Sequence, residues 1–268
     1  CRIDPFGNGP KVGVCGADAD TLAARQLVRM IAAGATAHSD HGRDIVTTFR
    51  EVAEHGEGNY TLKDEKKLLA LAAELEVPTK SRTLFQVAKE IAEIALEEFG
   101  MRRDKLHFIN RAPKVRQELW AGLAVEPRGI DREVVECMHR THMGVDTDYV
   151  NLTLQGIRTS LSDGWGGSMW ATELSDVLFG TPEVVEGWSN LGVLSNDKVN
   201  IVVHGHEPTL SDVIVFAAKD PALVQLAKDK GAQGINICGM CCTGNEILMR
   251  HGVPIAGNFL QQELAIIT

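Results

Sequence analysis

Two short apolar runs near the end of the chain constrain its fold most strongly. Residues 199–203 and 234–239 have the composition of buried β-strands, and the helix-like segment 209–230 lies between them. Strands that are joined through a helix pair in parallel within one sheet. A short helical segment at 245–250 and a third apolar run at 253–256 continue the alternation. The pattern therefore predicts the start of a parallel α/β domain.

The preceding part of the chain has a helical period instead. Apolar residues recur every three or four positions, Asp20 is a candidate N-cap for the first helix, and the glycine-rich segment 163–168 predicts a turn. We therefore predict a mixed α and α/β protein, with a helical domain over 1–197 and an α/β domain over 198–268. The expected helices lie at 18–48 (one helix or two), 68–75, 84–99, 115–123, 132–142, 149–161 and 170–178.

Composition narrows the class of protein. With 268 residues, 44% hydrophobic and 24% charged, the chain is long enough for a substantial core and is typical of a globular protein. The net charge of −9 and the lack of a basic stripe argue against a nucleic-acid partner. No apolar run reaches the roughly 20 residues that span a bilayer. Because the chain opens on Cys1 and ends on the apolar run 264–268, we expect it to be a piece of a longer protein.

Cysteine usage points to metal or redox chemistry. The chain is too large, and its thiols too few, for a disulfide scaffold. The six cysteines are Cys1, Cys15, Cys137, Cys238, Cys241 and Cys242.

Candidate metal ligands follow the two predicted strands. His204 and His206 follow the first strand, and Cys241 and Cys242 follow the second. Because parallel strands end at the same edge of a sheet, imidazole and thiolate would meet there, which is typical of a soft-metal site. Each residue alone has a simpler explanation, a helix cap for His206 and a small buried hydrophobe for Cys242. We expect at most one ligand from each pair, and the remaining ligands of a site must come from elsewhere.

Two further groups could carry chemistry. Cys1 and Cys15 enclose two prolines and three glycines, a composition that suits either a loop around an iron–sulfur cluster or an ordinary surface loop. His38 and His41 lie three residues apart on one helical face, which suits a proton relay or a solvated polar stretch. The cysteine and two histidines at 137–142 have mixed helical spacing, so we interpret them as structural, and Cys238 as part of the core.

Segments that span nearly the whole chain resemble the catalytic subunit of anaerobic nickel–iron–sulfur carbon monoxide dehydrogenases, in family order. They are CRIDPFG at Cys1, GVCGADADT at Gly13, RMIAAGATAHSDHGR at Arg29, HRTHMGVD at His139, DGWGGS at Asp163, VNIVVHGHEPTLSD at Val199, INICGMCCTGNEILMRHGVP at Ile235 and GNFLQQELAI at Gly257. The resemblance implies a helical domain followed by two Rossmann-like domains, and this chain corresponds to most of the helical domain and the start of the first Rossmann-like domain.

The resemblance also implies ligands for two cofactors. Cys1 and Cys15 match the last two cysteines that hold a [4Fe-4S] cluster, whose first two ligands would precede Cys1. His206 matches the histidine ligand of the nickel–iron–sulfur (Ni-4Fe-4S) active-site cluster, and Cys242 its first cysteine ligand. Cys241 is the neighbour that competes with Cys242. The other cysteine ligands would lie beyond Thr268.

Proton-transfer residues carry over in the same way. His38 and His41 match the start of a histidine track, which continues at Asp44 with a carboxylate in place of the usual histidine. Asp163 matches a residue that orients His38.

The implied reaction is the reversible oxidation of CO with water to CO2, two protons and two electrons. The electrons would pass through iron–sulfur clusters to a ferredoxin-like acceptor in an anaerobic cytoplasm. The resemblance further implies a homodimer and, in some relatives, docking with acetyl-CoA synthase. We expect the chain alone to be inactive, because most active-site ligands are missing from it.

The alternative is a non-catalytic iron–sulfur electron-transfer or cluster-binding module on the same scaffold. A nucleotide-binding domain is disfavoured, because no glycine-rich fingerprint follows the first strand.

Overall fold

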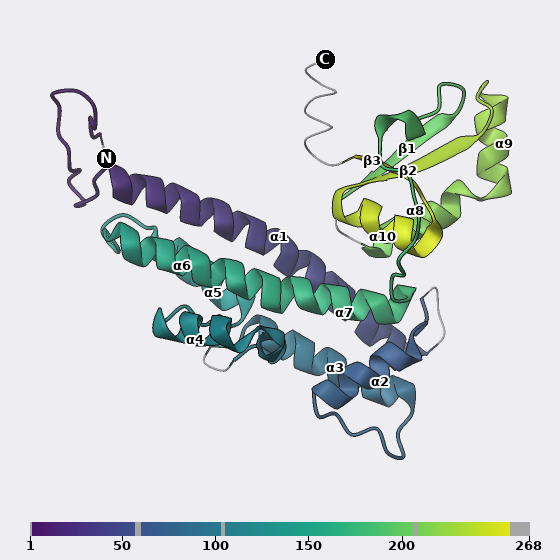
Figure 1. Cartoon of the computed structure of the whole chain (residues 1–268), viewed down its shortest axis with the longest axis horizontal. Coiled ribbons are helices and arrows are strands. Elements are labelled where there is room, and N and C mark those ends of the chain that lie inside the picture. The colour runs from purple at the N-terminus through teal and green to yellow at the C-terminus, as the bar shows by residue number, and fades with distance from the viewer. Residues whose placement is uncertain (1, 57–59, 103–104, 206–207, 258–268) are drawn as a thin grey trace. The chain divides into compact units, whose positions relative to one another are not determined.

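A computed structural model describes residues 2–56, 60–102, 105–205 and 208–257 (Figure 1). The chain divides into two compact units. The helical unit comprises Cys1–Gly58 and Leu69–Leu174, and the sheet unit comprises Asn59–Leu68 and Ser175–Thr268. The mixed α and α/β fold class is confirmed, whereas the domain boundary predicted at residue 197 stays a prediction.

The α-helices are α1 (Ala19–His55), α2 (Glu65–Glu74), α3 (Leu84–Phe99), α4 (Lys114–Gly122), α5 (Ile130–Arg140), α6 (Tyr149–Ser162), α7 (Ser168–Phe179), α8 (Pro208–Ala218), α9 (Pro221–Asp229) and α10 (Cys241–His251). Shorter helical turns are η1 (His107–Arg111), η2 (Asp163–Gly167) and η3 (Leu191–Val193), and the strands are β1 (Val199–His204), β2 (Ile235–Met240) and β3 (Ile255–Gly257). Among the described residues, no helix is both long and apolar enough to cross a membrane.

Helix α1 is the central helix of the helical unit. It packs against α3, α5 and α6, and Figure 1 shows α6 running along it. Its buried positions recur every three or four residues, as the amphipathic pattern predicts. Ala24, Val28 and Ala32 on this stripe form a core cluster with Cys137 and Leu152. The structural interpretation of Cys137 agrees with this position.

The start of α1 corrects one sequence expectation. The N-cap is Asp18 and not Asp20, because the Asp18 carboxylate accepts a hydrogen bond from the Thr21 N–H at 2.8 Å. The helix then continues without a break to His55 and ends before Gly56, whose φ of 74° no other residue type adopts readily.

The glycine-rich segment after α6 is helical and not a turn. Residues Asp163–Gly167 form a π-helical segment that joins α6 directly to α7. Glycines allow its close approach to α1, because a Cβ on Gly42 would lie 2.8 Å from the Gly167 carbonyl oxygen. This contact holds the π-segment against the part of α1 that carries His38 and His41.

The sheet unit contains a parallel sheet in the order β1-β2-β3, as the sequence predicts. Helices α8 and α10 pack on it, and Val203, Val215, Ile247 and Val253 form the core between strands and helices. The predicted helix over 209–230 is instead two helices. Pro221 has no N–H to continue α8, and the Asp220 side chain caps α9 through the N–H groups of its first turn.

Candidate metal centre and proton-transfer groups

The two strand ends meet at one edge of the sheet, as expected. The parallel register pairs His204 with Met240, the last residues of β1 and β2. Beyond them, the Thr243 N–H donates to the Gly205 carbonyl oxygen at 2.9 Å. The segment that carries Cys241 and Cys242 therefore lies directly beside the residue that precedes His206. His206 itself lies outside the described residues.

The two cysteines lie in a sharp strand-to-helix junction. Helix α10 begins at Cys241 and not near Asn245, so the cysteines occupy its first turn. Cys241 has a φ of 57°, in the left-handed region that disfavours residues with a Cβ. The junction is also very tight, because a Cβ on Gly239 would lie 2.4 Å from the Gly244 Cα. Only glycines permit this approach of strand and helix.

The neighbouring cysteines have different surroundings. Cys241 is half-buried and packs against the core cluster of Cys238, Met240 and Ala256, whereas Cys242 is exposed. Cys238 is buried, as expected for a core residue, and burial raises the pKa of its thiol. The accessible thiol of the junction is therefore that of Cys242.

The residues at this edge fit a bound thiolate-ligated cluster. The Thr243 hydroxyl is buried and lacks a hydrogen-bond partner among the described residues, so a donor is available directly after Cys242. The first turn of α10 also favours negative charge. Within the described part of the chain, no three His, Cys, Asp or Glu residues are placed to hold a metal ion. The described residues at this edge therefore do not make up a metal site by themselves.

The segment between the two N-terminal cysteines is the tight irregular loop that its composition predicts. The Asp4 carboxylate accepts hydrogen bonds from the N–H groups of Gly7 at 2.6 Å and Gly9 at 3.0 Å, which lower the pKa of this carboxyl group. The Lys11 ammonium donates to three carbonyl oxygens of the loop. Cys1 lies outside the described residues.

Cys15 closes this loop three residues before the cap of α1. The backbone N–H of Ala17 and the Arg25 guanidinium lower the pKa of its thiol, so its environment favours the thiolate form that binds metals. The Arg25 Nη1 lies 4.0 Å from the Cys15 Sγ. These donors, together with a buried Arg25 Nε that has no partner in the described part of the chain, fit an anionic cluster held by Cys15.

His38 forms the contact that was expected with Asp163. Its Nδ1 lies 2.9 and 3.0 Å from the two carboxylate oxygens of Asp163, the first residue of the π-segment. This hydrogen bond raises the pKa of the half-buried imidazole. With Nδ1 donating to the carboxylate, Nε2 is the nitrogen that can accept a proton. His41 lies one turn further along α1 and is also half-buried.

Ser168 is a member of this cluster that the sequence did not identify. Its Oγ lies 3.3 Å from His38 Nδ1 and donates to Asp163 Oδ1 at 3.2 Å. The Ser168 N–H donates to the Asp163 carbonyl oxygen, an i to i+5 bond that places both side chains on one face. The spacing of five residues between Asp163 and Ser168 predicts a contact only in a π-helix, so the sequence alone did not reveal it.

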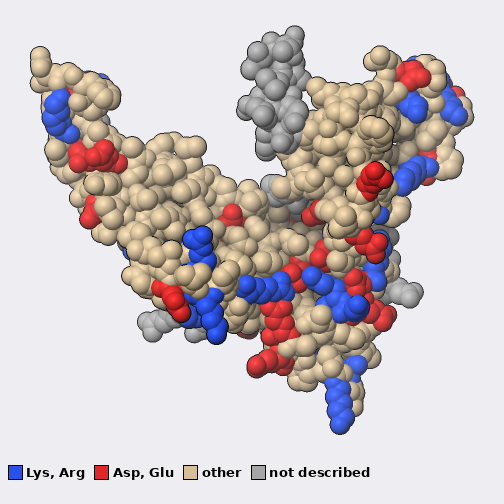
Figure 2. Space-filling model, in the orientation of Figure 1, with Lys and Arg blue, Asp and Glu red and all other residues tan. Residues whose placement is uncertain are grey.

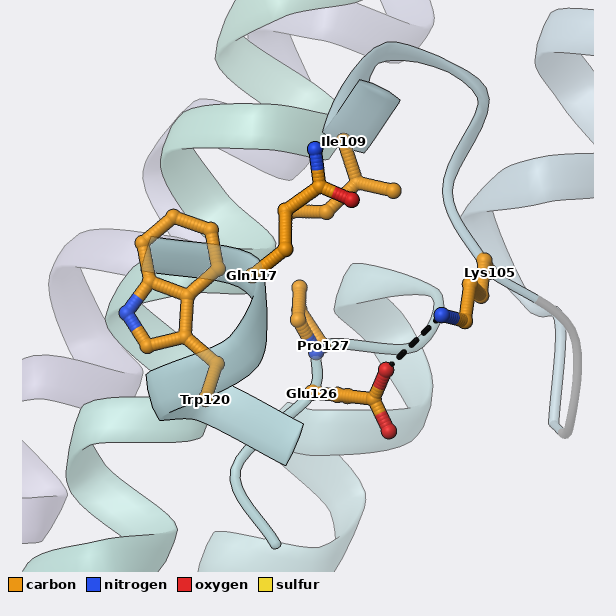
Figure 3. Close-up of a pocket in the computed structure, with 6 residues that line it drawn as sticks. All are labelled: Lys105, Ile109, Gln117, Trp120, Glu126 and Pro127. Carbon is orange, nitrogen blue, oxygen red and sulfur yellow. Dashed lines mark ion pairs between the residues drawn. The ribbon is translucent and has the colours of Figure 1, made fainter. Parts of the chain in front are cut away.

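Neither the pocket drawn in Figure 3 nor the charged face drawn in Figure 2 points to a second site. A small pocket in the helical unit contains the 2.9 Å ion pair of Lys105 with Glu126 but no thiol or imidazole (Figure 3). It is lined by Lys105, Ile109, Gln117, Trp120, Glu126 and Pro127. On the face drawn in Figure 2, the basic and acidic side chains of the described residues are interspersed and form no continuous basic stripe.

The fold and these groups define a mixed α and α/β protein with thiols presented at a braced loop and at a strand–helix junction. The chain matches the Prismane/CO dehydrogenase family over residues 1–268, and it belongs to that family.

The similar proteins are much longer than this chain. Carbon monoxide dehydrogenase 1 of Methanosarcina mazei is 60% identical over 268 residues, 100% of this chain and 43% of the relative. The carbon monoxide dehydrogenase/acetyl-CoA synthase subunit beta of Moorella thermoacetica is 41% identical over 100% of this chain and 40% of its own length. A nickel-free crystal structure of carbon monoxide dehydrogenase from Thermococcus sp. AM4 superposes with a TM-score of 0.90 at 58% identity, covering 100% of this chain and 42% of that one. The chain thus spans less than half the length of these relatives.

Proposed function

We propose that the full-length protein is an anaerobic carbon monoxide dehydrogenase, an oxidoreductase that interconverts CO plus water with CO2, two protons and two electrons. The proposal depends most on the arrangement of residues at the edge of the sheet. There the 2.9 Å hydrogen bond between Gly205 and Thr243 brings the Cys242 turn beside the residue that precedes His206. Family membership and relatives named carbon monoxide dehydrogenase support the same conclusion.

In this proposal, His206 and Cys242 are ligands of a nickel–iron–sulfur cluster, with the other ligands beyond Thr268. When bound, that cluster supplies the site for CO and water and accepts two electrons. Helix α10 favours the negative charge of the Cys242 thiolate at its N-terminus. The buried Thr243 hydroxyl, which has no partner among the described residues, would donate a hydrogen bond to the bound cluster.

The helical unit handles protons and electrons. His38 accepts a proton at Nε2 while Asp163 holds Nδ1 and stabilises the imidazolium. His41 and Asp44 lie further along α1 and continue the proton path. Cys1 and Cys15 would hold a [4Fe-4S] cluster, which would supply electron transfer to a ferredoxin-like acceptor.

The assembly and location follow from the same proposal. The protein is a homodimer in an anaerobic cytoplasm. Association with an acetyl-CoA synthase is supported by the relative whose name joins the two activities.

The test uses the full-length protein, purified without oxygen. We expect both iron and nickel in the metal analysis, together with CO-dependent reduction of a viologen dye. Full iron loading without nickel and without CO-dependent reduction would overturn the enzyme proposal and favour the electron-transfer module.

A further inference from the structure

Arg25 is a buried cation beside a proposed cluster ligand. The residue is 7% exposed and lies on α1, two turns after the Asp18 cap. One end of its guanidinium, Nη1, lies 4.0 Å from the Cys15 Sγ, and the other, Nη2, donates to the Asp146 carbonyl oxygen at 2.6 Å. The side chain therefore links the thiol to the loop before α6.

No carboxylate of the described residues forms an ion pair with Arg25. Two other partly buried arginines have such partners: Arg128 pairs with Glu133, and Arg250 pairs with Asp176. The Arg25 Nε is also buried and has no hydrogen-bond partner in the described part of the chain. Because a buried charge without an opposite charge is costly, an anion beside Arg25 would stabilise it. Cys15 is the only anion-forming side chain that the structure places against its guanidinium among the described residues.

We propose that Arg25 is the counter-charge of the N-terminal [4Fe-4S] cluster and raises its reduction potential through Cys15. This inference rests on the proposed function. Cysteine-ligated clusters are anionic, and reduction adds one further negative charge. A buried cation and an N–H donor directed at a ligand sulfur both stabilise the reduced form more than the oxidised form. Loss of Arg25 therefore makes the cluster harder to reduce.

The geometry requires arginine and not merely positive charge. The planar guanidinium reaches the Cys15 sulfur and the Asp146 carbonyl at once, whereas a lysine ammonium acts as a point charge. Arg29, one turn further along α1, binds Thr141 instead, through the hydroxyl at 3.1 Å and the carbonyl at 3.3 Å. Arg29 thus provides a matched control on the same helix.

The test is an anaerobic redox titration of the full-length protein, followed by electron paramagnetic resonance, for Arg25→Gln, Arg25→Lys and Arg29→Gln. In Arg25→Gln, we expect the ratio of reduced to oxidised cluster for one [4Fe-4S] component to be at least tenfold lower at the wild-type midpoint potential. This corresponds to a midpoint lowered by about 59 mV for one electron. Arg25→Lys should show a smaller shift in the same direction, and Arg29→Gln should match the wild type.

A normal iron content with an unchanged midpoint in Arg25→Gln would overturn the inference. If Arg25→Gln loses the cluster, Arg25→Lys decides: a lowered midpoint supports the proposal and an unchanged one overturns it. A wild-type protein that holds no [4Fe-4S] cluster would instead refute the proposed function.

Discussion

The two units place their candidate functional groups by different physical means. In the helical unit, side chains do the positioning: Asp4 braces the N-terminal loop, and Asp163 holds His38. In the sheet unit, the backbone positions the candidate groups, through the parallel register and the close contact between Gly239 and Gly244. A side-chain contact can be lost locally, whereas a backbone contact is shared with the whole sheet. The first kind of site should therefore be adjustable, and the second should form completely or not at all.

The largest effect is expected from Gly244→Ala in the sheet unit. The new Cβ would lie 2.7 Å from the Gly239 carbonyl carbon, and neither backbone can move without breaking the junction. We expect a loss of about 3 kcal/mol of stability in urea unfolding of the metal-free full-length protein, together with loss of nickel binding. Gly34→Ala is the helical control. The new Cβ at position 34 has no neighbouring atom within 4 Å, and alanine should stabilise α1 by about 0.5–1 kcal/mol. Equal stability of the two variants would show that the junction is not held by backbone packing.

A second test asks whether the junction shares its stability with the rest of the sheet unit. The buried Asp212 of α8 forms an ion pair with His251 at the end of α10. Asp212→Ala should destabilise the protein by about 2 kcal/mol, because the histidine loses a charged hydrogen-bond partner in a buried position. The exposed Asp229→Ala should change the urea midpoint very little. An Asp212→Ala midpoint equal to that of the wild type would show that this pair does not tie the helices together.

In the helical unit, Asp163→Asn should change proton transfer and leave the fold intact. Asp163 raises the pKa of His38 above its usual value of about 6.5. The contribution of the pair to stability is therefore complete below that pH and is lost as the pH rises through the raised pKa. Removal of the carboxylate charge lowers the pKa of His38, so the acidic limb of the pH profile for CO-dependent viologen reduction should move to lower pH. The exposed Ser160→Ala, on α6 outside this cluster, is the control with no expected shift. An unmoved limb in Asp163→Asn would exclude His38 as the titrating base.

The smallest effect on the whole protein is expected from Asp4→Ala. The loop loses the acceptor for its Gly7 and Gly9 N–H groups, but no core contact changes. We expect an unchanged urea midpoint and faster alkylation of Cys15 by iodoacetamide in the metal-free protein, measured by peptide mass spectrometry. The exposed Asp20→Ala should alkylate at the wild-type rate. A lowered midpoint in Asp4→Ala would mean that the loop is part of the unit's core.

The sequence predicted most where one strong pattern decides the structure. Helix α3 lies at 84–99 as predicted, because its apolar period agrees with the Thr83 capping box and with Gly100. The strand edge was also predicted, since the parallel pairing of β1 and β2 follows from the helical crossover between them. These features depend on residues that are near in sequence or on rules of topology.

The sequence failed where two local solutions compete or where a distant contact decides. Asp18 and Asp20 are both acceptable caps, and only the hydrogen bond to Thr21 selects Asp18. The glycine-rich segment is π-helical and lies closely against Gly42, a contact between residues far apart in the chain that local patterns do not reveal. Ser168 was missed for the same reason.

The role of Cys242 as a cluster ligand is tested most directly by comparing Cys242→Ser with Cys137→Ser in the full-length protein, purified without oxygen. Cys137 is the control, because it is a buried thiol that contacts the Thr159 hydroxyl at 2.9 Å within the helical core. The measurement is nickel per subunit together with CO-dependent viologen reduction. We expect Cys242→Ser to lose both the nickel and the activity, and Cys137→Ser to keep both. Wild-type nickel content and CO oxidation in Cys242→Ser would contradict this role.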